Sequence, residues 1–238
     1  MDINPSECLF SLGIGLKYRP NFSLRDNFGN IIDDILYSRG SLFNEDFFPE
    51  SKTEFNEHIL FNKDTNNNLR IGSHGSYVEV VSELGNNKFF SNITTAFKNN
   101  IIYGAFNKYK LTQIAMIGLV NRYLIKDKDY SNYIVRYFTN NVTQDINSLD
   151  IKFTRRKPVP ESLAKKKVND HINIIYNIIK KTELDEIFLS IDYQLRYDPY
   201  LTDVSQIKFD DFVSNCNAVN NKEFKKLTNI YSEGSNVA

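Results

Sequence analysis

The chain has 238 residues, of which 41% are hydrophobic and 13% aromatic, and this is enough for one large core or two fused small ones. Lysine plus arginine and aspartate plus glutamate both number 29, so the overall charge draws the protein neither to nucleic acid nor to an anionic membrane. The two cysteines, Cys8 and Cys216, argue against a disulfide framework. Without a signal-peptide pattern or a membrane-length apolar run, we expect a cytoplasmic protein.

The first half of the chain opens on a strand and a helix. Apolar and polar residues alternate from Cys8 to Arg19, which predicts a half-buried strand. Apolar residues from Phe28 to Leu36 follow helical spacing, with Ser23 as the expected N-cap and Gly40 as the stop. After an acidic loop, the patterns predict strands near 55–63, 69–73 and 77–83, and then a helix over 89–106.

The second half is interpreted in a similar order. Its pattern predicts an apolar strand over 111–125, a helix over 130–138, extended segments at 148–155 and 170–181, a strand over 187–197 and a helix over 209–230. The strand over 187–197 alternates as regularly as the first strand of the chain. The order of elements therefore repeats, with a strand and a helix opening each half.

A short repeat supports this doubling. The segment Ile14–Arg19 (IGLKYR) returns as Ile117–Arg122 (IGLVNR), each time on a strand-like run just before a helix-like one. We predict an α+β fold of two similar strand-helix-strands-helix halves, 1–110 and 111–238, fused as one compact unit. Antiparallel curved sheets would pack on helices, as in TATA-binding-protein-like or helix-grip folds. The alternative is that the repeat is a coincidence.

The segment Leu111–Tyr123 (LTQIAMIGLVNRY) resembles the R-x-G-L-R-Y-x-N-R strand of a sporadically distributed family of uncharacterised prokaryotic proteins. Ala115 and Val120 depart from that pattern, and the resemblance covers mainly residues 90–235. It implies a stand-alone cytoplasmic α+β protein, of a kind often encoded beside mobile-element or defence genes. It implies no catalytic residue.

No catalytic or metal motif stands out. His58, His74 and His171 are scattered, so we expect no metal site, no cofactor and no assignable catalytic residue. The glycine-rich segment 72–76 lacks a following helix, which favours a tight turn over a phosphate loop. Gly15 and Gly118 interrupt the two leading strands, and we attribute them to curvature of the sheet.

Two arginines and one basic segment are the candidate binding residues. Arg19 and Arg122 are equivalent in the repeat and would hold a phosphate or carboxylate in a shared cleft; the alternative is a solvated strand end. The segment 152–167 contains Pro158 and Pro160, and we interpret it as an irregular loop that could bind nucleic acid. Its cations are Lys152, Arg155, Arg156, Lys157, Lys165, Lys166 and Lys167. A solvated loop, or one that faces the acidic 45–57 loop of a partner subunit, is the alternative.

These observations favour a non-enzymatic protein-interaction module, with a protein partner or its own copy, in a bacterial or phage-associated, defence-type system. That hypothesis depends on aromatic residues that we expect to be half-exposed. They are Phe43, Phe47, Phe48, Tyr123, Tyr130, Tyr197 and Tyr200. A nucleic-acid or nucleotide binder that uses the 152–167 segment is the alternative, and an enzyme whose site residues are distant in sequence is the third possibility.

Overall fold

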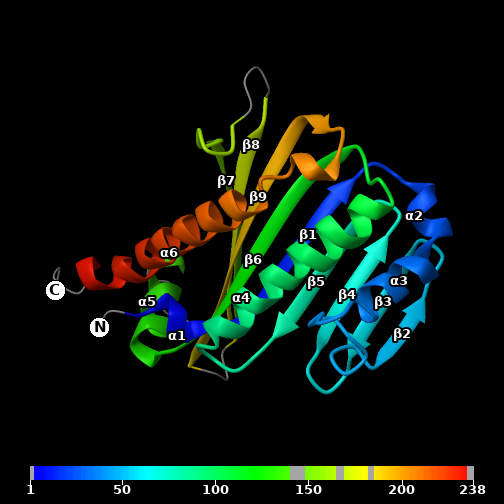
Figure 1. Cartoon of the computed structure of the whole chain (residues 1–238). Coiled ribbons are helices and arrows are strands. Elements are labelled where there is room, and N and C mark those ends of the chain that lie inside the picture. Colours follow the sequence, from blue (N-terminus) through cyan, green and yellow to red (C-terminus); the bar gives the residue numbers. More distant parts are fainter. Residues whose placement is uncertain (1–2, 140–147, 165–168, 182–184, 235–238) are drawn as a thin grey trace.

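A computed structural model describes residues 3–139, 148–164, 169–181 and 185–234 (Figure 1). The elements of the first half are α1 (Pro5–Cys8), β1 (Leu9–Tyr18), α2 (Phe22–Asp26), α3 (Phe28–Leu36), β2 (Glu50–Thr53), β3 (Glu57–Asn62), β4 (Asn67–Gly72), β5 (Gly75–Val81), α4 (Asn87–Ala96) and the π-helical η1 (Phe97–Phe106). Those of the second half are β6 (Ile114–Lys126), α5 (Lys128–Thr139), β7 (Ser148–Pro158), β8 (His171–Lys181), β9 (Glu186–Leu201), the 3₁₀ turn η2 (Val204–Gln206) and α6 (Phe209–Gly234).

The nine strands form one antiparallel sheet in the order β2-β3-β4-β5-β1-β6-β9-β8-β7, and the long helices α4 and α6 cross one of its faces (Figure 1). Alternating residues of the central strands bury their side chains against these helices. Leu12, Ile14 and Leu16 of β1 are 4%, 0% and 2% exposed, and Leu189 of β9 is 2% exposed. The predicted α+β class with a curved antiparallel sheet is confirmed.

The opposite face of the sheet is here called the open face. A row of directly paired residues crosses its centre, from Tyr77 of β5 through Gly15 of β1 and Gly118 of β6 to Gln194 of β9. Side chains of paired residues in an antiparallel sheet project to the same side. The row therefore identifies the residues that belong to the open face.

The helices α1 to α4 begin at asparagines. The predicted Ser23 cap is wrong, because Asn21 caps α2 by accepting a hydrogen bond from the Leu24 backbone N–H at 3.2 Å. The chain bends at Asn27, and α3 then buries Ile31 and Ile35. The helix predicted over 89–106 runs from α4 into π-helical turns that end at Phe106.

Two predictions about strands are wrong. β2 lies in the segment predicted to be an acidic loop, because a short, exposed edge strand has no apolar alternation to reveal it. The first part of the predicted 152–167 loop is instead the end of β7, which pairs with β8 without a break from Ser148 to Pro158. The alternating buried residues of β8, among them Ile172 and Ile174, anchor this ladder.

The two sides of the sheet have matching strand orders. Outward from the centre, one side runs β1-β5-β4-β3-β2 and the other runs β6-β9-β8-β7. β1 and β6 open the two parts of the chain and pair with each other, and the last strand of each part, β5 or β9, lies on the outer side. Gly15 lies directly opposite Gly118. That the halves 1–110 and 111–238 superpose stays a prediction.

Candidate binding groove on the open face

A groove of about 670 Å³ lies on the open face. Its lining residues are Gly15, Leu16, Lys17, Glu54, Phe55, Asn56, Glu57, Arg70, Gly72, His74, Gly75, Ser76, Tyr77, Met116, Gly118, Val120, Asp192 and Gln194. Glu57 of β3 and Gln194 of β9 are five strands apart in the sheet order, and a flat sheet would separate them by about 24 Å. The sheet thus curves around the groove. The volume falls within the range of ordinary ligand sites.

The floor of the groove contains the Gly15–Gly118 pair, but the two glycines differ. A Cβ on Gly15 would lie 2.6 Å from the Ser76 carbonyl oxygen, so the close approach of β5 requires glycine there. A Cβ on Gly118 would have no heavy atom closer than 3.7 Å. Packing within the chain requires glycine at position 15, whereas a Cβ at position 118 would make only ordinary contacts with the side chains of Asp192, Gln194 and Met116. That the two glycines serve the curvature of the sheet stays a prediction.

Tyr77 forms one wall and is held in place by Arg122. Its ring lies over Gly13, where a Cβ would come within 2.1 Å of the Tyr77 hydroxyl oxygen. Arg122 donates hydrogen bonds to the Tyr77 hydroxyl at 3.2 Å and to Ser11 Oγ at 3.1 Å, and it forms an ion pair with Glu79 at 2.6 Å. Burial raises the pKa of Tyr77, so its hydroxyl stays neutral. Arg122 is therefore engaged within the chain.

Asp192 and Gln194 supply polar groups at the β9 side. The Gln194 side-chain amide donates a hydrogen bond to Asp192 Oδ2 at 2.6 Å. The other carboxylate oxygen, Oδ1, lies 3.7 Å from the position a Cβ on Gly118 would take. Burial raises the pKa of Asp192, although the positive charges of Arg122, Arg196 and Lys152 oppose that rise. Oδ1 is placed to accept a hydrogen bond from a group above the glycine floor.

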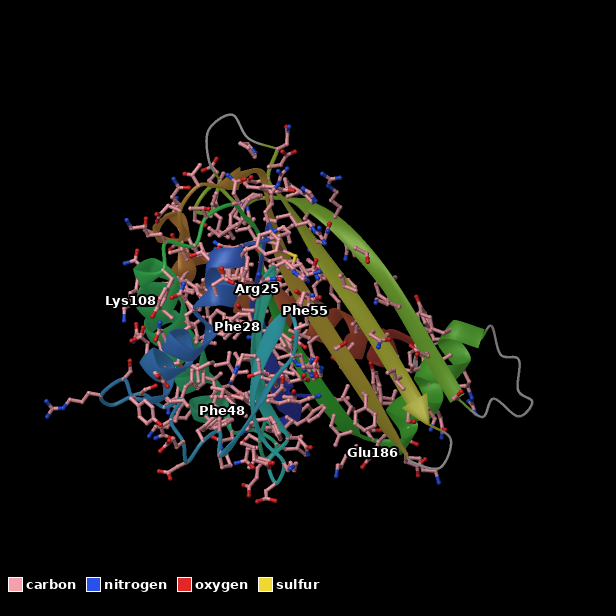
Figure 2. All side chains as sticks on the ribbon, turned by 90° about the vertical axis from the view of Figure 1, so that its right-hand side faces the viewer. Arg25, Phe28, Phe48, Phe55, Lys108 and Glu186 are labelled. Atoms are coloured by element: carbon pink, nitrogen blue, oxygen red, sulfur yellow. The ribbon has the colours of Figure 1, made fainter. Side chains whose placement is uncertain are left out.

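Phe55 stands at the rim with its side chain in solvent. It lies in the turn between β2 and β3 and is 82% exposed. The Arg25 guanidinium lies 5.8 Å from the Phe55 ring and 5.2 Å from the ring of Phe22, which is 59% exposed (Figure 2 labels Arg25 and Phe55). This cation–π arrangement fixes an apolar surface beside the groove.

The structure does not bring Arg19 and Arg122 together. β1 and β6 are antiparallel, so Arg122 lies opposite Ser11, near the start of β1, whereas Arg19 follows the last residue of that strand. Arg19 is exposed, and its guanidinium lies 5.0 Å from the Tyr200 ring. The shared cleft predicted from the repeat is wrong, because the expectation ignored the opposite directions of the two strands.

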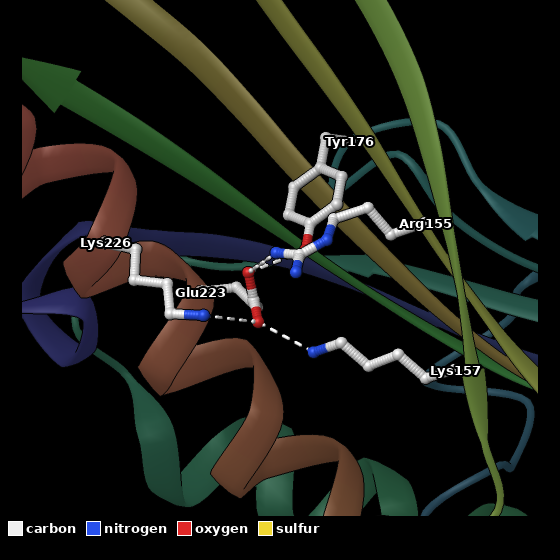
Figure 3. A network of polar contacts seen from close by, with 5 residues as sticks. All are labelled: Arg155, Lys157, Tyr176, Glu223 and Lys226. Atoms are coloured by element: carbon white, nitrogen blue, oxygen red, sulfur yellow. Dashed lines mark hydrogen bonds and ion pairs between the residues drawn. The ribbon is translucent and has the colours of Figure 1, made fainter.

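The predicted basic segment is partly neutralised by α6, as Figure 3 shows. Glu223, which is 2% exposed, accepts hydrogen bonds from Arg155 at 3.1 Å, from Lys157 at 2.8 Å and from the Tyr176 hydroxyl at 2.8 Å. Lys226 of α6 also contacts it at 3.3 Å. Burial raises the pKa of Glu223, but these partners outweigh burial and lower it to about 2.

The remaining predicted cations are placed differently. Arg156 is exposed on β7 and belongs to the open face, because it pairs with Asn173, which pairs with Gln194. Lys165, Lys166 and Lys167 lie outside the described residues. The cations of the segment therefore form no single patch on the described part of the chain.

The aromatic residues expected to be half-exposed are mostly core residues. Phe43, Phe48, Tyr123, Tyr130 and Tyr197 are buried, and only Tyr200 is exposed, at 38%. Phe55, Tyr77, Asp192 and Gln194, which line the groove, were not among the residues predicted from the sequence. Asp192 and Gln194 occupy polar positions of an alternating strand. That alternation was the signal in the sequence that could have placed them on the polar face of the sheet. The link to Gly118 needed the strand register.

The structure also places the predicted glycine-rich turn and Cys216. Ser73 and His74 form the two-residue connection between β4 and β5, in agreement with the predicted turn. Cys216 is buried, and burial raises its pKa.

Across the described ranges, no three His, Cys, Asp or Glu side chains are grouped to hold a metal ion. None of the described helices is both long and apolar enough to cross a membrane.

The comparisons with known proteins establish no family. No family model matches the chain, and no curated protein matches it. Among solved structures, the di-domain ARO/CYC StfQ from the steffimycin biosynthetic pathway is 8% identical over 96% of this chain and 99% of that chain, with a TM-score of 0.23. A likeness at that TM-score carries no argument. The resemblance of Leu111–Tyr123 to the prokaryotic family stays a prediction.

Proposed function

We propose that the protein is a non-enzymatic interaction module that binds a segment of a partner protein in the groove of the open face. The observation that carries this proposal is that Gly118 lies on the groove floor although packing does not require a glycine there. A β-branched residue would stabilise a strand better than glycine at that position. Glycine there keeps the groove deep, so we infer that the space serves an occupant.

The groove offers a partner both apolar and polar contacts. Met116 and Val120 flank the glycine floor, and Asp192 Oδ1 lies above it. Phe55 extends the apolar surface beyond the rim, and exposed aromatic residues held by arginine are typical of interaction hot spots. An apolar side chain next to a hydrogen-bond donor of the partner would fit this arrangement.

The proposed fold at finer detail is two similar halves, in the manner of TATA-binding-protein-like or helix-grip folds. The matching strand orders on the two sides of the sheet and the direct pairing of Gly15 with Gly118 support this proposal. In that arrangement the groove lies where the two halves meet.

Photo-crosslinking tests the proposed function. A benzophenone side chain in place of Phe55 would lie at the groove, and one in place of Tyr103, which is 40% exposed on η1, serves as the control. In host cells, we expect the Phe55 probe to yield one major crosslinked protein that the Tyr103 probe does not. Adding Gly118→Val should remove that product, because the side chain fills the floor. Equal products from both probes, or none, would contradict the proposal.

A further inference from the structure

The two edges of the sheet are built differently. β2 has four residues, and its charged side chains are engaged locally, Glu50 with Lys63 and Lys52 with Glu54. β7 has eleven residues and pairs with β8 from end to end without a register shift. Among the described strands β7 pairs with β8 alone, and Figure 2 shows it as the outermost long strand.

A long regular edge offers main-chain groups to another strand. In an antiparallel ladder, the N–H and C=O groups of every second residue point away from the paired neighbour. Over the length of β7, about five residues therefore present both groups outward. Natural sheets commonly shorten, bulge or cover such edges to prevent unwanted pairing. β2 is short in this way, whereas β7 is neither short nor bulged.

The side chains of β7 alternate in chemistry between the two faces. Asp150, Lys152, Thr154 and Arg156 project on the open face, and all four are exposed. Neither Lys152 nor Arg156 forms an ion pair with a described residue, whereas Arg155 and Lys157 on the other face are engaged by Glu223. The open side of this edge thus carries two cations and one acid, Asp150, and the charge of Lys152 also acts on Asp192 of the same face.

The intervening positions are apolar in the first part of the strand and cationic at its end, where Arg155 and Lys157 form ion pairs with Glu223. Ile151 and Phe153 are half-buried, and the Phe153 ring stacks on Tyr176 at 4.4 Å between centroids. Cross-strand neighbours interact most favourably when opposite charges meet and when apolar side chains meet. A strand that alternates acidic and apolar residues would therefore match Lys152 and Arg156 on the open face and Ile151 and Phe153 on the other face. Its acidic residues, four apart, would span the roughly 13 Å between Lys152 and Arg156.

We propose that β7 is a docking edge that accepts an extended segment of another protein, with alternating acidic and apolar residues, as a tenth strand of the sheet. A second copy of β7 is a poorer occupant, because each copy carries four cations and one acid, so two paired copies would repel each other overall. Nucleic acid cannot complete the main-chain ladder, and the one aromatic ring of β7, Phe153, is already stacked within the protein. The proposal uses a different surface from the groove and does not depend on its function.

A labelled peptide tests this edge directly. The probe is a short peptide of alternating Glu and Val with a fluorophore, and binding is followed by fluorescence anisotropy on the full chain. We expect binding that weakens as salt rises, and an affinity about tenfold lower for Lys152→Glu combined with Arg156→Glu. The matched control is Arg39→Glu combined with Lys88→Glu, two exposed cations elsewhere with the same total charge change. It should bind like the wild type.

Two further probes separate strand pairing from charge attraction alone. The same peptide with alternate amides N-methylated keeps its charge but cannot pair, so we expect its binding to be lost. Equal binding of the N-methylated peptide would overturn the proposal. So would tighter binding of a single-stranded oligonucleotide that the double reversal removes, or a wild-type dimer that the reversal dissociates. Crosslinking from Phe55 should be unaffected by the reversal, which keeps the two proposals distinguishable.

Discussion

The two faces of the central strands are made from neighbouring residues with opposite roles. On the helix-covered face, Leu12, Ile14 and Leu16 of β1 are nearly inaccessible to solvent. On the open face, the same strand carries Gly13, Gly15 and Lys17, and β6 carries Gly118 beneath a groove. Residues on the first face are explained by burial. The packing of the chain explains only some residues of the open face. Gly118 is one that it does not explain, and binding is proposed at the groove above it.

The largest expected effect is the loss of folding when a charge is placed on the helix-covered face of the sheet. Leu189→Asp or Leu12→Asp would place an unpaired charge among the helices, at a cost of several kcal/mol against a total stability of roughly 5–15 kcal/mol. We expect neither variant to fold. Ser190→Asp is the control, because the Ser190 side chain lies on the open face opposite Arg122. Circular dichroism and thermal melting would check this, and a folded Leu189→Asp variant would contradict the assignment of faces.

A second effect concerns the attachment of α6 to β7. The pKa of Glu223 is lowered to about 2 from the 4.5 of an ordinary glutamate, so its ionised form stabilises the fold. The shift corresponds to roughly 3 kcal/mol, fully present above about pH 5 and lost as the pH falls toward 2. We expect Glu223→Gln to lower the free energy of unfolding by roughly that amount at neutral pH.

Urea denaturation at two pH values measures this effect. The difference between wild type and Glu223→Gln should shrink by more than half at about pH 3, because the wild-type carboxylate has then lost most of its advantage. A difference that does not change with pH would show that the loss comes from packing rather than from the ion pairs with Arg155 and Lys157.

The smallest effect compares the two paired glycines. Gly15→Ala should destabilise the protein by about 1–3 kcal/mol, because its Cβ would meet the β5 backbone. Gly118→Ala should change stability by less than about 0.5 kcal/mol, since its Cβ has room. The free energies of unfolding in urea give both values. Similar losses at both positions would mean that Gly118 is also required by packing.

The sequence predicts those parts of the fold in which one face is buried. The alternation in β1 and β9 and the apolar stripe of α3 follow directly from burial, and they are recovered. β2 has no buried face and was predicted as loop. The end of β7 was also predicted as loop, because cations and a proline such as Pro158 are typical of loops. Pairing with β8 makes this segment a strand. Tertiary pairing, not local propensity, decides both segments.

The candidate site was less predictable for a geometric reason. Gly118 was visible in the sequence, but its environment depends on which residues lie opposite and across the sheet. The groove combines the Glu54–Glu57 turn with Asp192, and only the curvature of the sheet brings them to one cavity. The predicted pairing of Arg19 with Arg122 shows the reverse case. Equivalent positions in a repeat lie at opposite ends when the two strands are antiparallel.

The most direct test of the central claim measures stability and binding together in one variant. Gly118→Val should retain the wild-type melting temperature within a few degrees, while the crosslinked product from the Phe55 probe disappears. Gly29→Ala, at a glycine of α3 with no atom near its Cβ position, should retain both. If Gly118→Val keeps its stability and still yields the same crosslinked product, the part of the groove above Gly118 is not a binding site.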